Sequence, residues 1–406
     1  MTQETTTKDI VLVAAARTPM CEYVGTPGYG KLSRFSAIDL GAHAAKAAIE
    51  RAGIDAESID HVIMGNALQT SVDAIYGARH VGLKAGVAES CPALTVNRLC
   101  GSGIQALVSG AQMIQLGEAE TVLAGGMESM SQAPYAFYGG RDGIRFGTTP
   151  ELQDTLFAAL KDPVAGLFMA ETAEKIAKTR EIPREAQDEY ALRSHLLGAA
   201  AVAEGRFAEE IAPVVIETRK GELVIDTDDH IRPETTLEGL AKLRAAFGKD
   251  GTVTAGNASG IVDGAAVVVM TTADRAAADG LTVMSILRGW AYVGVDPTEM
   301  GIGPVPAIRA CLERAGVSQD EIDLFEINEA FAAQYLGCEK ELELDREKCN
   351  VNGGAISLGH PLGATGTRLV QTVSLELARS NKRYGIASAC IGGGQGIAML
   401  LENPNA

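Results

Sequence analysis

The chain is short of charge and contains no long uninterrupted apolar run. Only 21% of its 406 residues are charged, whereas 46% are hydrophobic. This composition supplies a large core and lacks the polar, highly charged character of disordered segments. The length predicts more than one packed unit. Because no apolar stretch is long enough to cross a bilayer, we expect no membrane-spanning helix and no membrane partner.

Basic residues are also scarce. The 35 lysines and arginines are outnumbered by 52 aspartates and glutamates, which gives a net charge of -17. This balance argues against nucleic acid or an anionic membrane surface as a partner, since both attract basic proteins. An anionic ligand would have to meet a local basic patch.

The sequence also lacks closely spaced cysteine pairs and export signals. The seven cysteines include no C-x-x-C pair, and H-E-x-x-H is missing too, so the sequence predicts reduced thiols and no metal site. Residues 1–8 lack the charged and apolar regions of a signal peptide and the arginines of a transit peptide. Residues 403–406 form no peroxisomal signal. We therefore expect a cytoplasmic protein.

One segment of the chain recurs 263 residues later, the difference between positions 50 and 313. The sequence E-R-A-G-I at 50–54 returns as E-R-A-G-V at 313–317, and each copy is followed by I-D. Both copies read as the end of a helix with a glycine cap, then a loop and a strand. The same offset relates residues 101–103 to 364–366 and residues 123–124 to 386–387, so the repeat extends over several elements.

The repeat predicts two related α/β halves with mostly parallel sheets and helices on both faces. The first half should cover residues 1–131 and be completed by about residues 258–283, where 265–271 form a β-prone run. The second half should cover 284–406. Residues 132–257 are rich in charge and in helix formers, so we expect them to form an inserted subdomain.

Two cysteines and a histidine each lie in a glycine-rich turn, and a cysteine paired with a histidine is a nucleophile with its base. Cys100 stands between a β-prone stretch, 93–96, and a helical pattern, where the helix dipole favours thiolate. His360 precedes a proline that favours extended backbone. Cys390 ends a predicted strand at 384–389. A buried, inert thiol and a structural histidine are the ordinary alternatives.

The glycines after Cys390, beginning at Gly392, would expose backbone N–H groups that suit an oxyanion. A phosphate-binding loop is the alternative, but the lysine of a P-loop and the G-x-G-x-x-G order are absent. Asn328 follows a predicted strand and could hold a water in an oxyanion site, although the residue taken alone is better explained by an Asx turn. A basic patch of the insertion suits a phosphorylated ligand or, as readily, a solvated face: Arg219, Lys220, Arg232, Lys242, Arg244 and Lys249.

Together these residues resemble the thiolase family over essentially the whole chain. The ordered motifs are N-R-L-C-G-S-G at 97–103, G-G-M-E-S-M-S at 125–131, G-T-V-T-A-G-N-A-S-G at 251–260, N-E-A-F-A at 328–332, N-V-N-G-G-A-I-S-L-G-H-P-L-G at 350–363 and C-I-G-G-G-Q-G at 390–396. Residues 73–80 look most like 3-ketoacyl-CoA thiolases of mitochondrial type and their bacterial relatives.

The resemblance implies a five-layered α-β-α-β-α core and a set of roles. Cys100 would be the acylated nucleophile, His360 its base, Asn328 part of one oxyanion hole, and Cys390 the acid/base at the α-carbon. The N–H groups of Cys100 and Gly392 would form the second hole. Coenzyme A would be a substrate, with no permanently bound cofactor, and a homodimer or homotetramer is expected. The implied coenzyme A contacts are Arg232, Leu243, Phe247, Ala255, Ser259, Met169, Met300 and Phe331.

Three positions depart from the pattern. Phe168 and Ala170 flank Met169 where many members have a Met-Gly pair, preceded by histidine in short-chain condensing enzymes, so acyl-chain preference is left open. Gly239 stands where some relatives have serine. Competing functions are a decarboxylating ketoacyl synthase, which typically uses two histidines instead of a second cysteine, a non-catalytic acyl-CoA-binding protein, and a nucleotide-binding α/β protein.

Overall fold

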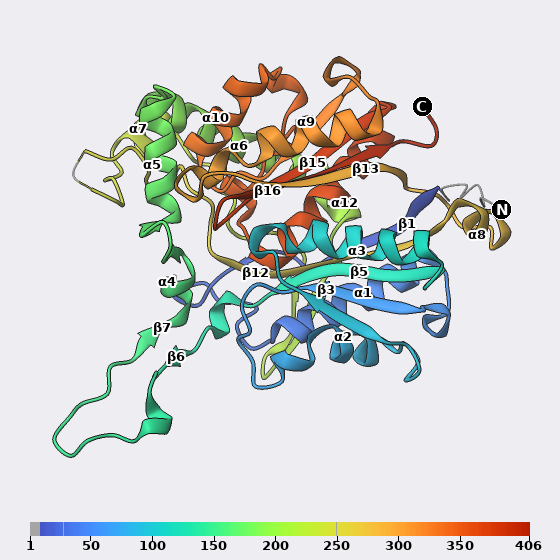
Figure 1. The fold of residues 1–406 in the computed structure, drawn as a ribbon, viewed down its shortest axis with the longest axis horizontal. Coiled ribbons are helices and arrows are strands. Elements are labelled where there is room, and N and C mark those ends of the chain that lie inside the picture. Colours follow the sequence, from blue (N-terminus) through green and yellow to red (C-terminus); the bar gives the residue numbers. More distant parts are fainter. Residues whose placement is uncertain (1–8, 27, 249) are drawn as a thin grey trace, which may run out of the picture.

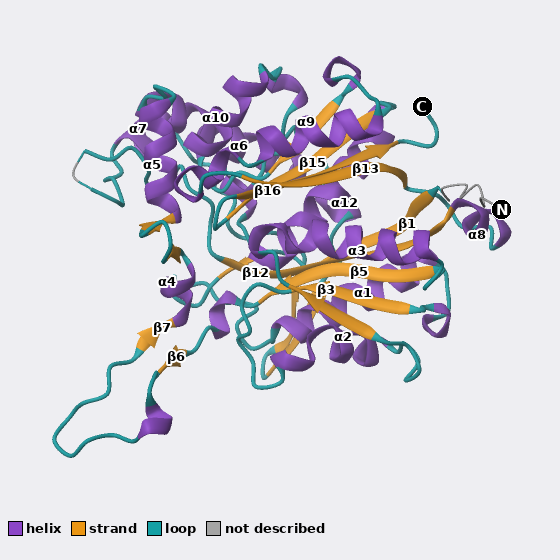
Figure 2. Ribbon diagram, in the orientation of Figure 1, coloured by secondary structure: helices purple, strands orange, loops and turns teal. Residues whose placement is uncertain are grey.

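The computed structural model describes residues 9–26, 28–248 and 250–406; the expectations for residues 1–8 and Lys249 lie outside this part of the chain. Five layers lie on one another in Figures 1 and 2: helices, a sheet, helices, a second sheet and helices. The predicted five-layered fold is confirmed. The central layer consists of α3 (Ser102–Leu116) and α12 (Leu362–Ser380).

Each half contributes four equivalent neighbouring strands, and the first half adds a fifth, β4, at the end of the strand order. The first half has β1 (Ile10–Arg17), β3 (His61–Gly65), β4 (Ala93–Val96), β5 (Thr121–Glu128) and β12 (Val262–Thr272), with α1 (Ala37–Ala52) and α2 (Gly77–Ala85) outside. The second has β13 (Ser285–Gly294), β14 (Leu324–Ile327), β15 (Tyr384–Ile391) and β16 (Gln395–Glu402), with α9 (Pro304–Ala315) and α10 (Ala332–Leu342) outside. Over the described residues the order is β14-β15-β16-β13-β1-β12-β5-β3-β4.

The sequence repeat corresponds to a repeat of strand register. Val62 of β3 pairs with Leu123 of β5, and Phe325 of β14 pairs with Ile386 of β15, both in parallel. The glycine caps also recur, because α1 ends at Gly53 with φ 67° and α9 ends at Gly316 with φ 66°. Left-handed backbone of this kind costs glycine little. The two copies therefore match residue by residue at their helix ends and strand pairs.

The prediction of mostly parallel sheets was wrong. Parallel pairing joins β3 to β4 and β5, and β14 to β15, whereas β1, β12, β13 and β16 pair antiparallel with their neighbours. The cause is local in the second half, since only residues 392–394 separate β15 from β16, and so short a connection reverses the chain. In the first half β12 enters between β1 and β5 after the long insertion.

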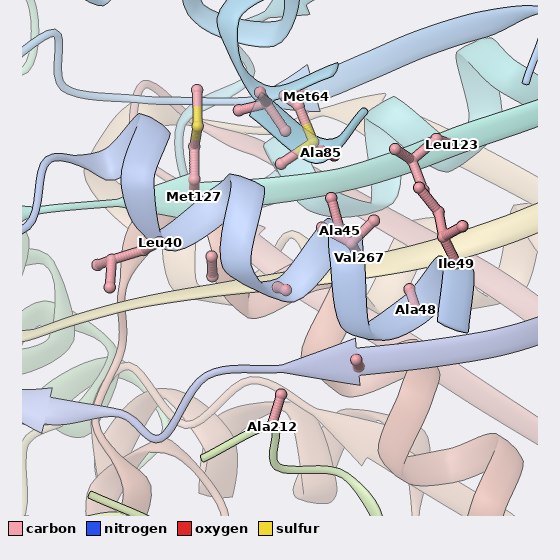
Figure 3. Close-up of a cluster of buried hydrophobic side chains, with 14 of the residues drawn as sticks. Leu40, Ala45, Ala48, Ile49, Met64, Ala85, Leu123, Met127, Ala212 and Val267 are labelled. Atoms are coloured by element: carbon pink, nitrogen blue, oxygen red, sulfur yellow. The ribbon is translucent and has the colours of Figure 1, made fainter. Parts of the chain in front are cut away.

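The core is built from the faces that these elements turn toward each other. In the outer layer of the first half, Leu40, Ala45 and Ile49 of α1 pack toward Leu123 of β5 and Val267 of β12 (Figure 3). In the central layer, an added Cβ at Gly103 would lie 2.5 Å from the Thr367 nitrogen. The glycine therefore lets the first turns of α3 and α12 touch, and these are the turns that follow Cys100 and His360.

Residues between β5 and β12 wrap around one end of the layers. They form α4 (Thr155–Ala159), α5 (Met169–Thr179), α6 (Arg184–Ala203) and α7 (Leu237–Ala241), with short hairpins β6–β7 (Tyr135–Ala136, Gln153–Asp154), β8–β9 (Lys161–Asp162, Leu167–Phe168) and β10–β11 (Val214–Thr218, Gly221–Ile225). The arm between β6 and β7 projects away from the body (Figure 1). No helix in the described residues combines the length and apolarity needed to span a bilayer.

Buried ion pairs attach the insertion to the first half. Arg17 of β1 is fully buried and donates from Nε to Glu210 at 2.6 Å and from Nη1 to Asp228 at 2.7 Å. Removing one member of such a pair would leave an uncompensated charge in the interior. The insertion is thus a packed part of the molecule rather than a loose loop.

Candidate active site

Cys100 lies in a tight turn between β4 and α3, as its sequence context predicts. The turn, Leu99–Gly101, is a single 3-10 turn, and Leu99 has φ 47°, a value that costs a residue with a side chain energy. The Leu99 N–H donates to Asn97 Oδ1 at 2.9 Å, and the Arg98 N–H donates to Ser102 Oγ at 2.8 Å. These two bonds offset part of the strain and fix the direction of the thiol.

The expected thiolate at Cys100 is not what the environment favours. Burial raises the pKa of the Cys100 thiol to about 11, more than the N–H groups of Gly392 and Cys100 lower it, and the charge of Glu128 raises it further. The helix dipole argument fails because desolvation of the charged form is the larger effect. At neutral pH Cys100 is therefore a thiol, and it needs a base to become a nucleophile.

His360 has the protonation state of a base. Burial lowers the pKa of His360 to about 3, with the charge of Arg368 adding to the effect, so the imidazole is neutral near pH 7. Its Nδ1 lies 2.6 Å from Thr365 Oγ1. Because the Thr365 hydroxyl donates to the Pro361 carbonyl at 3.0 Å, its oxygen is left to accept a proton from Nδ1.

This assignment puts the acceptor lone pair of His360 on Nε2. The Asn328 side chain agrees with it, since Asn328 Nδ2 donates toward Nε2 at 3.3 Å. Asn328 is fully buried at the end of β14. The imidazole is therefore oriented from both ends, with its acceptor nitrogen next to Asn328.

Cys390 and Gly392 complete the group from the β15–β16 turn. Cys390 is 1% exposed and packs with Met300 and Ala330. Burial raises the pKa of its thiol well above the ordinary value, and the neighbouring Cys100 raises it further, while a hydrogen bond from Asn328 lowers it. An added Cβ at Gly392 would meet the Met169 sulfur at 3.2 Å. Cys390 is thus a neutral thiol beside Cys100 and Asn328.

An apolar cavity of about 160 Å³ leads to this group. Phe168 packs between Phe157 and Phe247 on one side of it, with the ring planes tilted and the ring centroids 4.7 and 5.6 Å away. Cys100 packs with Met130 and Leu362, two of the lining residues. The other lining residues are Leu160, Met169, Ala170, Ser259, Gly260, Ile261, Phe331 and His360. The lining therefore includes four of the eight residues expected to contact coenzyme A, together with His360.

The other four expected contacts lie outside the cavity lining. Met300 is buried beside Cys390. Leu243 is at the surface, where it approaches Gly256, and Ala255 is exposed next to it. Arg232 donates to Glu22 Oε1 at 2.6 Å and to the Asp229 carbonyl at 2.9 Å, so its charge is already paired.

The described basic patch is spread out rather than gathered at the cavity. Lys242 is paired with Glu238 at 2.6 Å. Arg219 and Lys220 lie in the exposed turn of the β10–β11 hairpin, and Arg244 is exposed near α7.

Two supporting residues escaped the sequence analysis. Thr365 sets the tautomer of His360, and its only signal was its equivalence to Ser102 in the repeat. Glu329 lies beside Asn328 and accepts from Tyr190 at 2.7 Å and Ser194 at 2.7 Å, both on α6, and also from Asn350 and the Ile356 N–H. The sequence shows Glu329 within the N-E-A-F-A motif but does not indicate which residues donate to it.

Two family profiles match the chain, one after the other. The profile of the family described as "Thiolase, N-terminal domain" matches residues 10–274, and that of "Thiolase, C-terminal domain" matches residues 281–403. The human protein named 3-ketoacyl-CoA thiolase, mitochondrial, is 50% identical over 396 residues, 98% of each chain. The acetyl-CoA acetyltransferase of Escherichia coli strain K12 is 47% identical over 399 residues, covering 98% of this chain and 100% of the relative.

A solved structure is also similar throughout. The crystal structure of human mitochondrial 3-ketoacyl-CoA thiolase in complex with CoA superposes with a TM-score of 0.93 at 49% identity, over 98% of each chain.

The expected cytoplasmic location was wrong. The human relative, like a mouse relative at 49% identity, is named as mitochondrial. The expectation rested on unpaired thiols and on the composition of residues 1–8, and neither distinguishes the cytosol from another reducing compartment.

The family and the chemistry agree. Two profiles cover most of the chain, relatives near half identity cover nearly all of it, and two thiols and a neutral imidazole occupy the turns that the family motifs mark. The chain therefore belongs to the thiolase family and is an acyltransferase.

Proposed function

We propose that the protein transfers an acyl group between a 3-ketoacyl-CoA and coenzyme A through an acyl-enzyme on Cys100. Thiolysis gives acetyl-CoA and a shortened acyl-CoA, and the reverse is the condensation of acetyl-CoA to acetoacetyl-CoA. The observation that carries the proposal is the meeting of three turns: a Cys100 thiol, a neutral His360 and a second thiol, Cys390, at one apolar cavity.

The first half-reaction uses each of these groups once. His360 Nε2 takes the proton of Cys100, whose sulfur attacks the 3-keto carbon. The bond between carbons 2 and 3 then breaks, its electron pair forms the enolate of acetyl-CoA, and the Cys390 thiol protonates carbon 2. The acyl group remains on Cys100, and Cys390 is left as thiolate.

The second half-reaction returns every proton. The Cys390 thiolate takes the proton of the coenzyme A thiol, whose sulfur attacks the acyl carbon. Cys100 leaves and recovers its proton from His360. Two half-reactions separated by a covalent intermediate predict ping-pong kinetics.

Oxyanion stabilisation is the other requirement. Protonated His360 and Asn328 are donors on one side, and the N–H groups of Cys100 and Gly392 on the other. One such donor contributes about 3–4 kcal/mol to the transition state. The buried, apolar surroundings strengthen these interactions because water does not compete for them.

For coenzyme A we propose a path along the insertion, residues 132–257, between the halves at 1–131 with 258–283 and at 284–406. Met169, Phe247, Ser259 and Phe331 line the cavity and would contact the pantetheine arm and acyl chain, with Met300 beneath them. Leu243, Ala255 and Arg232 lie toward the surface and would meet the nucleotide end. The human relative has been solved with CoA, which supports coenzyme A as a ligand of this chain.

We also propose that the chain forms a homodimer or homotetramer. β4 is the last strand in the order of the described sheet, and Leu94 on it is 40% exposed. Val72 and Ile75, in the connection that follows β3, are exposed as well. A sheet edge with adjacent apolar side chains favours pairing with another chain. Sedimentation velocity decides between monomer, dimer and tetramer.

The test is a coenzyme-A-dependent cleavage assay on 3-ketoacyl-CoAs from four carbons upward, with acid-quenched mass spectrometry of the Cys100 peptide. We expect cleavage, an acyl group on Cys100, and the best chain length as a direct readout. Cys100→Ala should lose both. Cys390→Ala should neither make nor break the carbon–carbon bond, but it should still take an acetyl group onto Cys100 from acetyl-CoA. Cys91→Ala, at a thiol remote from the cavity lining, is the control. Folded wild-type protein with neither cleavage nor acylation would reject the proposal.

A further inference from the structure

Glu128 is a fully buried carboxylate that the mechanism above does not use. It is the last residue of β5 and belongs to the G-G-M-E-S-M-S motif at 125–131. Four N–H donors converge on it: Asn66 Nδ2 at 2.9 Å, the Leu68 N–H at 3.0 Å, the Ala67 N–H at 3.1 Å and the Gly363 N–H at 2.8 Å.

The four donors identify the ionised form of Glu128. Asn66 and Leu68 donate to Oε1, while Ala67 and Gly363 donate to Oε2, so both oxygens act only as acceptors. A proton on either oxygen would oppose one of these N–H groups. Burial raises the pKa of Glu128 to about 7, against the lowering effect of the N–H groups, so an assay at pH 8 lies on its ionised side.

One of the four bonds crosses from the first half to the turn that carries His360. Gly363 lies three residues after His360, in the first turn of α12. The approach is close, because an added Cβ at Gly126 would lie 1.8 Å from the Gly363 oxygen. The bond from Gly363 to Glu128 therefore fixes where the His360 turn lies against β5.

Another of the four bonds leads to Cys100. Ala67, held by Glu128, accepts at its carbonyl from Asn97 Nδ2 at 3.1 Å, and Asn97 Oδ1 accepts the Leu99 N–H at 2.9 Å. Ala67 and Leu68 also pack in the same apolar cluster as Cys100. Glu128 is thus connected to the strained turn of the nucleophile through one backbone group and one side chain.

We propose that Glu128 is a positioning residue that sets the distance between the Cys100 turn of the first half and the His360 turn of the second. The inference rests on the proposed function, and it adds a residue that touches neither substrate nor the reacting atoms. Proton transfer from Cys100 to His360 depends on this distance, and a displacement of about 1 Å costs about 100-fold in rate.

The test compares three variants at pH 8. Glu128→Gln keeps the shape, but its NH₂ group would oppose two of the four donors, so the two turns should separate. We expect kcat to fall about 100-fold, with the KM for coenzyme A within threefold of wild type because the cavity lining is untouched. Glu128→Asp keeps the charge and should recover part of kcat. Glu210→Gln is the matched control, since Glu210 is also buried and accepts from Arg17 and Thr372 away from both turns.

A second readout does not depend on turnover. The rate of Cys100 alkylation by iodoacetamide, followed by mass spectrometry, reports how well His360 activates the thiol. Removing the Glu128 charge by itself would lower the pKa of Cys100 and speed alkylation, so a drop in Glu128→Gln, and not in Glu210→Gln, reports displacement of the two turns. Should Glu128→Gln fail to fold, Asn97→Ala breaks only the branch to Cys100 at an exposed residue and should lower kcat and alkylation about tenfold.

Two results would overturn the inference. One is a kcat and an alkylation rate of Glu128→Gln within threefold of wild type. The other is a loss of kcat and alkylation in Glu128→Gln no larger than in a Glu210→Gln protein with the same drop in melting temperature. If Glu128→Gln does not fold, unchanged kcat and alkylation in Asn97→Ala would overturn it as well. Failure of the proposed function is seen separately, as wild-type protein that neither cleaves 3-ketoacyl-CoA nor becomes acylated.

Discussion

Replacing Thr365 by valine should remove the base from the active site without changing its shape. Valine has the size of threonine but no oxygen, so His360 Nδ1 loses the acceptor that now lies 2.6 Å away. The buried imidazole then has no reason to keep its proton on Nδ1. In the other tautomer the proton lies on Nε2, where it opposes the N–H of the Asn328 amide. Nε2 then has no lone pair to accept the proton of Cys100.

The size of the effect follows from the cost of an unpaired buried donor. Leaving one buried N–H without a partner costs about 1–3 kcal/mol. If that cost appears in full as loss of the competent tautomer, kcat falls about 5- to 150-fold, at 1.36 kcal/mol per decade. Thr365→Ser restores a hydroxyl and should stay within about threefold of wild type.

The assay is steady-state thiolysis together with the alkylation rate of Cys100 at several pH values, with folding checked by melting temperature. Thr365→Val should lose kcat and alkylation in parallel, while Thr365→Ser loses neither. A Thr365→Val enzyme with kcat within twofold of wild type would refute the tautomer assignment and the role given to Nε2.

Three further perturbations test other parts of the structure. Burial lowers the pKa of His360 to about 3, so between pH 6.5 and 3 the unfolded chain binds a proton that the folded chain does not. The free energy of unfolding should therefore decrease as the pH is lowered through this window, by up to about 1.4 kcal/mol per pH unit. In urea unfolding, His360→Asn should show a smaller dependence of stability on pH. An unchanged slope would contradict the neutral, buried imidazole. Gly126→Ala places a Cβ 1.8 Å from the Gly363 oxygen and should lower the melting temperature sharply. Gly294→Ala should be tolerated, because the added Cβ would lie 4.0 Å from the Gly394 oxygen. Arg17→Ala should destabilise the fold by about 3–5 kcal/mol, because Glu210 and Asp228 stay buried and unpaired; kcat of the folded fraction should be unchanged.

Local signals predicted the elements that carry the chemistry. The β-prone run at 93–96 is a strand with the predicted bounds, and the glycine caps at Gly53 and Gly316 adopt the expected left-handed backbone. These features depend on residues close in sequence, so the sequence contains the information. Strand direction does not, because apolar patterns look the same in both directions, and the antiparallel entry of β12 was missed.

Two features of the site depend on the folded structure and were not predicted from the sequence. Thr365 reaches His360 only because Pro361 and the first turn of α12 place it five residues on and on the same side. The pKa of Cys100 was misjudged because the dipole of the following helix is visible in the sequence, whereas the burial that outweighs it is a property of the assembled layers.

The late position of β12 in the chain has a consequence for synthesis. β12 lies between β1 and β5, so the first sheet stays open until residue 272 has left the ribosome, and the partner of Cys100 follows only at position 360. Domains usually fold as units during translation, and pairing between distant segments is slow. The nascent chain therefore carries an unactivated thiol for most of its synthesis, and a truncated product of the first 260 residues would expose the edges of β1 and β5 to chaperones and proteases.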